Sequence, residues 1–184
     1  MNNAIQGKRT VLVVLSALGM AMCAAPDAWA QQKQKVVYQA LAENTKYTQQ
    51  HVIDVGDMPG HQVRIYEIQR KFPKDGPRFE GVRMVESWSR GYSDYIELNG
   101  PSTVYVENVM ENGDRIFGRV QLISQGSPPA ADGSRKSQST IAGVITGGTG
   151  QFVGIRGTIR SSSAADIKAG VNSTQNEIEY WMVK

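Results

Sequence analysis

The side chains best suited to chemistry in this sequence are two carboxylates that alternate with aromatic residues. Glu86 lies two residues before Trp88, and Tyr105 lies two residues before Glu107. Alternate residues of a β-strand point to the same face, so each pair would share one face. A carboxylate buried among aromatic rings has a raised pKa and can act as a general acid or base. The candidate cavity-lining residues are Glu86, Trp88, Tyr95, Tyr105, Glu107 and Trp181.

A second interpretation of the same residues involves no chemistry. The aromatic rings would pack the core or cover the outer face, and Glu86 would pair with Arg83 or Arg90. A period of two residues separates the two faces of a strand but does not say which face is interior. Both interpretations therefore stay open at the level of sequence, and no catalytic residue is assigned.

The two histidines do not form a recognisable metal site. His51 and His61 are ten residues apart, with Asp54 and Asp57 between them. A metal site of the common kind would place its ligands in a tight motif such as His-x-x-x-His, which is missing here. We expect these four residues to be exposed polar groups at strand ends, and we expect no metal and no cofactor.

A cluster of glycines between Ile145 and Ser161 predicts a tight corner between two strands. Glycine adopts positive φ without strain and lets another backbone approach closely. A phosphate-binding loop would require a following helix and a Gly-Lys-Ser/Thr sequence, and neither is found. We therefore interpret the corner as structural. Its glycines are Gly147, Gly148, Gly150, Gly154 and Gly157.

The segments that must position these residues are strand-like from Tyr47 to the end of the chain. About eight short runs of β-forming residues are separated by turn signals, and no amphipathic helix of any length interrupts them. The clearest signal is Asn112-Gly113 between two alternating runs, which predicts a β-hairpin. We expect residues 125–136 and 162–176 to be loops.

These patterns predict an all-β fold, in which a single antiparallel eight-stranded barrel is favoured over a sandwich. The last strand-like run, residues 177–183, would pair with an early strand and so remove exposed edges. Residues 31–46 are expected to be a flexible lead-in, with one helical turn near residues 39–43, and residues 47–184 to be the barrel domain.

The first thirty residues have the three parts of a secretory signal peptide. Lys8 and Arg9 precede an apolar run over residues 11–25, and Ala28-Trp29-Ala30 supplies the small residues of a cleavage site. We expect cleavage after Ala30 and export to the periplasm or beyond, without a stable membrane span after cleavage. Acylation at Cys23, the only cysteine, is the alternative, although bulky Met residues precede it.

Charge composition makes nucleic acid an unexpected partner. The chain has 20 basic and 17 acidic residues, which gives a net charge of +3 with neutral histidines. No long basic run occurs, and removal of the signal peptide would leave the charges nearly balanced.

The segment from Thr146 to Gly157, TGGTGQFVGIRG, resembles a corner of the dirigent proteins and the allene oxide cyclases. Both are small eight-stranded antiparallel barrels of the calycin-like kind. The chain is most similar to bacterial allene oxide cyclase-like proteins, which join a signal peptide, an Asn-Gly-Asp hairpin such as Asn112-Gly113-Asp114, and this corner. The resemblance implies a barrel with a small apolar molecule at its mouth and a possible homo-oligomer. The plant relatives cyclise an unsaturated epoxide or orient coupling radicals, but no catalytic motif of theirs matches this chain.

Three functional hypotheses follow. The favoured one is an exported protein that binds a small hydrophobic ligand in its barrel. The second is an isomerase or cyclase without a cofactor, and the third is a structural or interaction protein with a filled barrel. A cavity would argue against the third hypothesis. Glu86 or Glu107 unpaired inside that cavity would favour an enzyme, whereas the same carboxylates in salt bridges would favour a binding protein.

Overall fold

A single antiparallel β-sheet forms almost the whole of the described chain. The computed structural model describes residues 32–166, 168–169 and 171–183, so the signal peptide expected at residues 1–30 lies outside the described residues. The strands are β1 (Gln34–Ala40), β2 (Thr45–Asp54), β3 (His61–Lys71), β4 (Arg78–Phe79), β5 (Val82–Ile96), β6 (Gly100–Met110), β7 (Arg115–Gly126), β8 (Lys136–Gly148), β9 (Ile155–Asp166) and β10 (Val171–Met182). Two three-residue 3-10 turns, η1 (Ala42–Asn44) and η2 (Gly150–Phe152), complete the elements.

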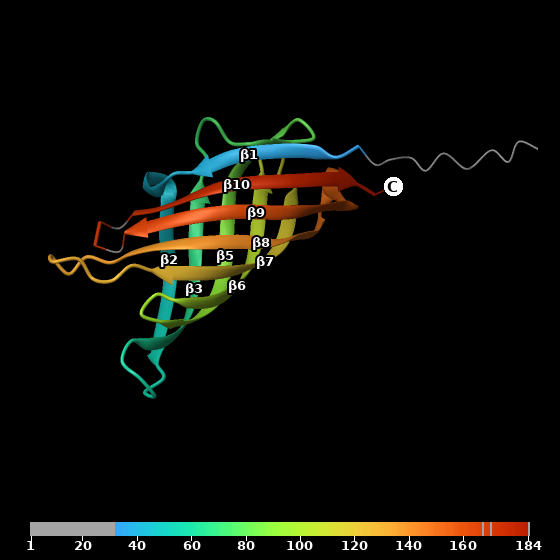
Figure 1. Cartoon of the computed structure of the whole chain (residues 1–184). Coiled ribbons are helices and arrows are strands. Elements are labelled where there is room, and N and C mark those ends of the chain that lie inside the picture. The colour runs from blue at the N-terminus through green and yellow to red at the C-terminus, as the bar shows by residue number, and fades with distance from the viewer. Residues whose placement is uncertain (1–31, 167, 170, 184) are drawn as a thin grey trace, which may run out of the picture. The chain divides into compact units, whose positions relative to one another are not determined.

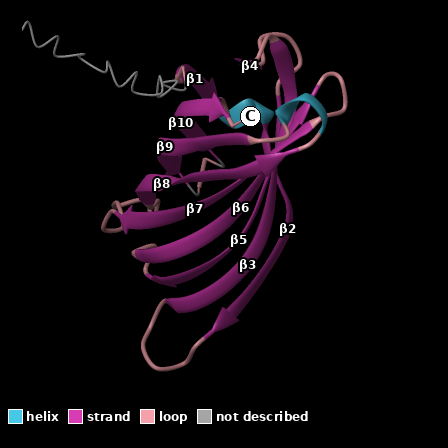
Figure 2. Ribbon diagram, turned by 90° about the vertical axis from the view of Figure 1, so that its right-hand side faces the viewer, coloured by secondary structure: helices cyan, strands magenta, loops and turns pink. Residues whose placement is uncertain are grey.

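The sheet has the order β1-β10-β9-β8-β7-β6-β5-β3-β2, with the short strand β4 paired to β5. All its pairings are antiparallel, which confirms the predicted all-β antiparallel class. The sheet curves so far that β8, β9 and β10 lie across β2, β3 and β5 (Figures 1 and 2). The predicted count of eight strands is wrong, because β1 and β4 are additional strands.

The last strand does pair with an early one, as the sequence predicts. β10 lies beside β1, with Gln34 opposite Tyr180 and Ala40 opposite Thr174. The edge strands β1 and β2 do not pair with each other, so backbone hydrogen bonds do not close the sheet. The two edges are nevertheless consecutive in the chain, since only the short turn η1 separates β1 from β2.

The structure differs from the expected lead-in over residues 31–46. Residues 34–40 of this segment form β1, and η1 supplies the helical turn slightly later than expected. Val36, Tyr38 and Ala40 turn toward the interior, while Val37 between them is exposed. The apolar signal of this strand is short, and its stability comes from pairing with β10, which is far away in the sequence.

The second expected loop, residues 162–176, is also mostly strand. β9 continues to Asp166 and β10 begins at Val171, so a connection of four residues replaces a loop of fifteen. The polar residues here resemble a loop in composition, but alternate ones face the interior of the sheet. The loop predicted at residues 125–136 is confirmed, because β7 ends at Gly126 and β8 begins at Lys136.

Large side chains pack one end of the concave side of the sheet, where they are almost completely buried. Phe79 and Tyr180 contact each other there, with ring centroids 5.3 Å apart. The Tyr180 hydroxyl accepts a hydrogen bond from the Glu80 N–H and donates one to Gln34. The most deeply buried large residues at this closed end are Phe79, Met84, Met110, Ile116, Phe152, Ile155 and Tyr180.

The Asn-Gly hairpin and the glycine corner meet at this closed end. The hairpin joins β6 to β7, and the corner joins β8 to β9 through η2, as predicted. The Arg115 N–H donates to the Thr149 hydroxyl (2.9 Å), and the Gln151 N–H donates to an Asp114 carboxylate oxygen (3.1 Å). Gly150 has a φ of +54°, a conformation that favours glycine. The corner therefore closes and braces the packed end of the sheet.

Candidate functional site

The concave side of the sheet holds a cavity of about 180 Å³ at the end away from the glycine corner. All the long strands contribute residues to its walls. The part of the cavity farthest from the glycine corner is lined by the ends of β7 and β9 and by the beginnings of β8 and β10. The apolar lining residues include Ile68, Phe72, Val104, Val106, Val120, Leu122, Ile141, Ile159 and Ile178. The polar lining residues include Ser87, Ser89, Asn108, Ser124, Ser137, Ser139, Ser161, Ser163, Asn172, Thr174 and Asn176.

Small side chains explain why this end of the interior is hollow. Ser139 on β8 lies opposite Ser163 on β9, and both line the cavity. The closed end carries phenylalanine, methionine and tyrosine at its interior positions, whereas β8 and β9 line the cavity end with Ser137, Ser139, Ser161 and Ser163. The same curved sheet is therefore filled at one end and hollow at the other.

Arginine and tyrosine supply the ionisable groups of the cavity. Arg64, Arg70 and four tyrosines line it, and no Asp or Glu is among its described lining residues. The Arg64 guanidinium lies 5.7 Å from the ring centroids of both Tyr66 and Tyr95. Burial raises the pKa of Tyr38 to about 12 and that of Tyr95 to about 12. These phenols are consequently neutral donors at neutral pH, and the cavity carries positive charge.

Of the six residues predicted to line the cavity, the structure places only Tyr95 there. Tyr105 is 55% exposed on the opposite face, under the guanidinium of Arg119. Trp88 packs on that face beneath Arg90, and Trp181 beneath Lys33. Trp88, Tyr105 and Trp181 therefore cover the outside of the sheet, and the prediction that they line the cavity is not met.

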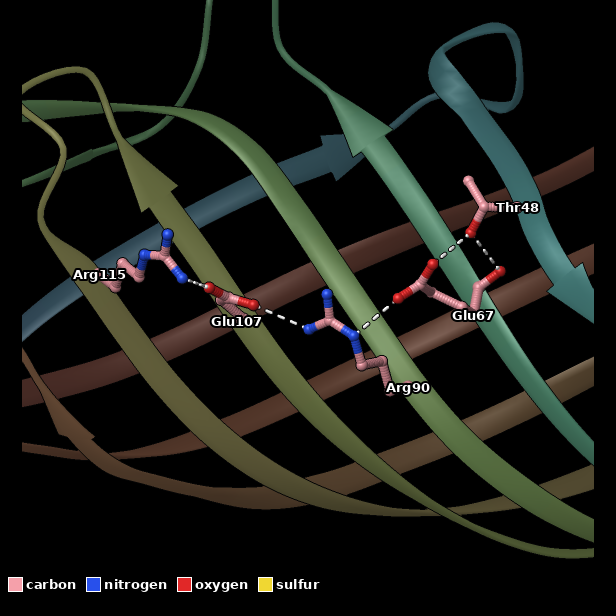
Figure 3. Close-up of polar contacts among 5 residues, drawn as sticks. All are labelled: Thr48, Glu67, Arg90, Glu107 and Arg115. Carbon is pink, nitrogen blue, oxygen red and sulfur yellow. Dashed lines mark hydrogen bonds and ion pairs between the residues drawn. The ribbon is translucent and has the colours of Figure 1, made fainter.

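Glu107 belongs to a polar ladder on the outer face (Figure 3). Its carboxylate pairs with Arg115 and lies 2.8 Å from Arg90 Nη1, and Arg90 Nε lies 2.7 Å from Glu67. Thr48 donates a hydrogen bond to Glu67, and together with Arg90 it lowers the pKa of that carboxyl. The ladder ties β2, β3, β5, β6 and β7 together across the outer face. Glu107 is thus salt-bridged, whereas the two arginines expected to pair with Glu86 have other partners: Arg90 pairs with Glu67 and Glu107, and Arg83 pairs with Glu111.

Glu86 also faces outward, and its neighbours face inward. It accepts a hydrogen bond from Gln69 on the adjacent strand β3. Ser87 and Ser89, one residue away from Glu86 and Trp88, line the cavity instead. A shift of one residue exchanges the two faces of a strand. The predicted two-residue alternation is therefore correct, but the candidate assignment of Glu86 and Trp88 to the interior face is wrong. Serine carries no signal of burial in a sequence, whereas tryptophan does, and this favoured the incorrect face.

The two histidines have different surroundings. His51 lies on the exposed edge strand β2. His61 Nδ1 lies 2.5 Å from an Asp57 oxygen, and His61 Nε2 lies 2.7 Å from an Asp94 oxygen. Both ring nitrogens must donate to satisfy two carboxylates, which favours the imidazolium form. The hydrogen bond to Asp94, and next that to Asp57, raises the pKa of His61.

We expect Asp94→Asn to lower the pKa of His61, as measured by NMR titration of its ring protons. A raised pKa in the folded state stabilises the fold fully below the ordinary value of about 6.5, and this contribution disappears as pH rises through the folded-state value. The stability difference between wild type and Asp94→Asn should therefore be larger at about pH 5.5 than at about pH 8.5. Asp75→Asn, at an exposed loop residue, is the control. A His61 pKa unchanged by Asp94→Asn would contradict the expectation.

No group of three or more His, Cys, Asp or Glu side chains among the described residues could hold a metal ion. Within the same residues, no helix has the length and apolar character needed to cross a membrane. Comparisons of the chain with protein-family models, with curated proteins and with solved structures gave no match.

Proposed function

We propose that this chain is an exported protein that binds a small, largely apolar molecule inside an incompletely closed β-barrel. The observation that carries the proposal is the cavity of about 180 Å³, walled by valine and isoleucine on several strands. Pockets for drug-sized ligands have volumes of roughly 300–1,000 Å³, so the ligand proposed here is smaller. Export is proposed from the signal-peptide pattern of residues 1–30.

The proposed barrel rests on the way the two edges of the sheet approach each other. β1 and β2 are joined by η1, and the Asn172 amide on β10 donates to the Tyr47 hydroxyl on β2 at 3.4 Å. This side-chain contact spans the seam that backbone hydrogen bonds leave open. A barrel with one open seam also agrees with the expectation from the resemblance to dirigent and allene oxide cyclase-like proteins, which stays a prediction.

The position of the carboxylates and the incomplete filling of the interior support binding over the two alternative functions. A cyclase that used Glu86 or Glu107 as a general acid or base would need that carboxylate in the cavity. Both carboxylates lie on the outer face, and Glu107 is paired with two arginines. A filled barrel would serve a purely structural role, but the large residues fill only the closed end.

The proposal is tested by filling the cavity from its outer part. Ser139→Trp places an indole in the cavity, because Ser139 is a lining residue outside the packed core. Thr140→Trp is the matched control, since Thr140 is the next residue of β8 and faces outward. Ligand-observed NMR with neutral 4-phenylbutyramide and with toluene should detect binding to wild type and to Thr140→Trp. We expect at least about a tenfold loss of affinity in Ser139→Trp, the equivalent of about 1.4 kcal/mol.

Binding that survives Ser139→Trp, or that Thr140→Trp weakens equally, would place the ligand elsewhere and refute a cavity site. A wild-type protein that binds neither of these neutral molecules nor the matching acid, 4-phenylbutyrate, would refute the proposed function. Near-ultraviolet circular dichroism of both variants reports whether each tryptophan leaves the fold intact.

A further inference from the structure

Arg70 is a cation inside the cavity with few of its hydrogen bonds made. It lies on the interior face of β3, where its Nη1 donates to the Ser89 hydroxyl at 2.9 Å. Its Nε is buried and has no hydrogen-bond partner among the described residues. Burial lowers the pKa of the Arg70 guanidinium, although arginine keeps its charge in proteins. The Arg70 side chain therefore lines the cavity with a single hydrogen bond to a described residue and with no acidic residue beside it in the described lining.

The chain separates its charges between the two faces of the sheet. On the outer face Arg90 and Arg115 pair with Glu107, and Arg83 pairs with Glu111. On the inner face Arg64 and Arg70 line the cavity without any Asp or Glu among the described lining residues. A buried charge without a counter-ion is costly to a fold. A site that retains such a charge is suited to a ligand that supplies the opposite one.

A second set of polar atoms extends the site across the strands. Arg70 lies opposite Ser87 on β5, and Ser87 lies opposite Asn108 on β6, so the three residues form a cross-strand row. Asn108 is only 4% exposed, and its Oδ1 has no described partner. Thr174 on β10 is 6% exposed and lines the same cavity with an unpartnered hydroxyl. The Ser87 and Thr174 hydroxyls and the Asn108 side-chain N–H groups are hydrogen-bond donors among the cavity-lining residues, and they suit a ligand group that accepts hydrogen bonds.

We infer that the ligand is a small organic carboxylate, whose carboxylate binds the Arg70 guanidinium and whose apolar body contacts the aliphatic wall. The inference rests on the proposed function and specifies the ligand class of the same cavity. A guanidinium donates two parallel hydrogen bonds to a carboxylate, and Ser87 and Asn108 lie in the adjacent row. Val104, Val120 and Ile159 provide the wall that the apolar body covers.

The test compares a carboxylate with its neutral amide on three proteins. Affinities of 4-phenylbutyrate and 4-phenylbutyramide are measured by NMR titration on wild type, Arg70→Met and Lys71→Met. Lys71 is the matched control, because it is the next residue of β3, is exposed, and also loses one positive charge. We expect wild type and Lys71→Met to bind the carboxylate at least about tenfold more tightly than the amide. Arg70→Met should abolish this preference and leave amide binding within about twofold.

Equal affinity for the two molecules in wild type, or a preference that persists in Arg70→Met, overturns the inference and leaves the proposed function intact. Binding of the amide without any binding of the carboxylate would likewise overturn the inference and leave the proposed function intact. If wild type binds neither 4-phenylbutyrate nor 4-phenylbutyramide, and does not bind toluene, the result counts against the proposed function itself. If Arg70→Met does not fold, the same two affinities are measured on Arg70→Lys instead. It keeps the charge but loses the planar pair of donors, so the preference for the carboxylate should fall without disappearing, and an unchanged preference overturns the inference.

Discussion

Replacing Gly157 with alanine is expected to lower the free energy of unfolding by about 3 kcal/mol. Gly157 lies on β9 directly opposite Tyr180 of β10. A Cβ atom at this position would lie 2.3 Å from the carbonyl oxygen of Glu179 and 3.0 Å from the Tyr180 Cα. These are backbone atoms, which cannot rotate away as the end of a flexible side chain can. The two strands would have to separate beside the packed end of the sheet.

Gly147→Ala is the matched control for this prediction. Gly147 belongs to the same glycine corner, but a Cβ atom there would meet nothing within 4 Å, and its φ is not positive. We expect this substitution to change stability by no more than about 0.5 kcal/mol. Urea unfolding followed by tryptophan fluorescence measures both variants. Similar losses for Gly147→Ala and Gly157→Ala would contradict the close approach of β9 and β10.

Phe152→Ala is expected to destabilise the fold by about 4 kcal/mol. Phe152 ends the turn η2 within the glycine corner, and its side chain is 0% exposed in the closed end of the sheet. Truncation removes the buried ring and leaves a cavity in the hydrophobic core. The cost therefore includes the lost burial of the ring and the lost contacts of its neighbours.

Val153→Ala, at the next residue, isolates the contribution of burial. Val153 is 67% exposed, so its truncation should cost no more than about 0.5 kcal/mol. Chemical denaturation at a fixed pH compares the two variants with wild type. A loss below about 1 kcal/mol for Phe152→Ala would mean that the closed end is not packed as described.

Predictions from the sequence succeeded where a few neighbouring residues decide the backbone. Asn112-Gly113 forms the predicted hairpin, and Gly113 has the positive φ (+87°) that such turns require. Gly150 and Gly154 likewise have positive φ in the predicted corner. What the sequence did not indicate is that hairpin and corner are hydrogen-bonded to each other through Asp114 and Thr149.

Predictions failed where the outcome depends on partners far away in the chain. Residues 34–40 resemble a flexible segment in isolation, yet β1 forms because β10 offers it a partner. The bond from Tyr180 to Gln34 joins residues 146 positions apart. Ser87 and Ser89 carry no cavity signal, because serine is common on every kind of surface. Arg70 carries none either, since the sequence does not show that its guanidinium has no acidic neighbour in space.

The sequence by itself determined the class of this fold, its Asn-Gly hairpin and its glycine corner, because turn chemistry and side-chain alternation act over a few residues. It also determined that Glu86 and Trp88 share one face of a strand. Only the tertiary structure decided that this face is the outer one, because the direction of curvature of a sheet is a property of all its strands together. Because of that curvature, Glu86 and Glu107 lie on the outer face and Arg70 lies in the cavity. The cavity therefore carries a positive charge, whereas the sequence had predicted carboxylates there.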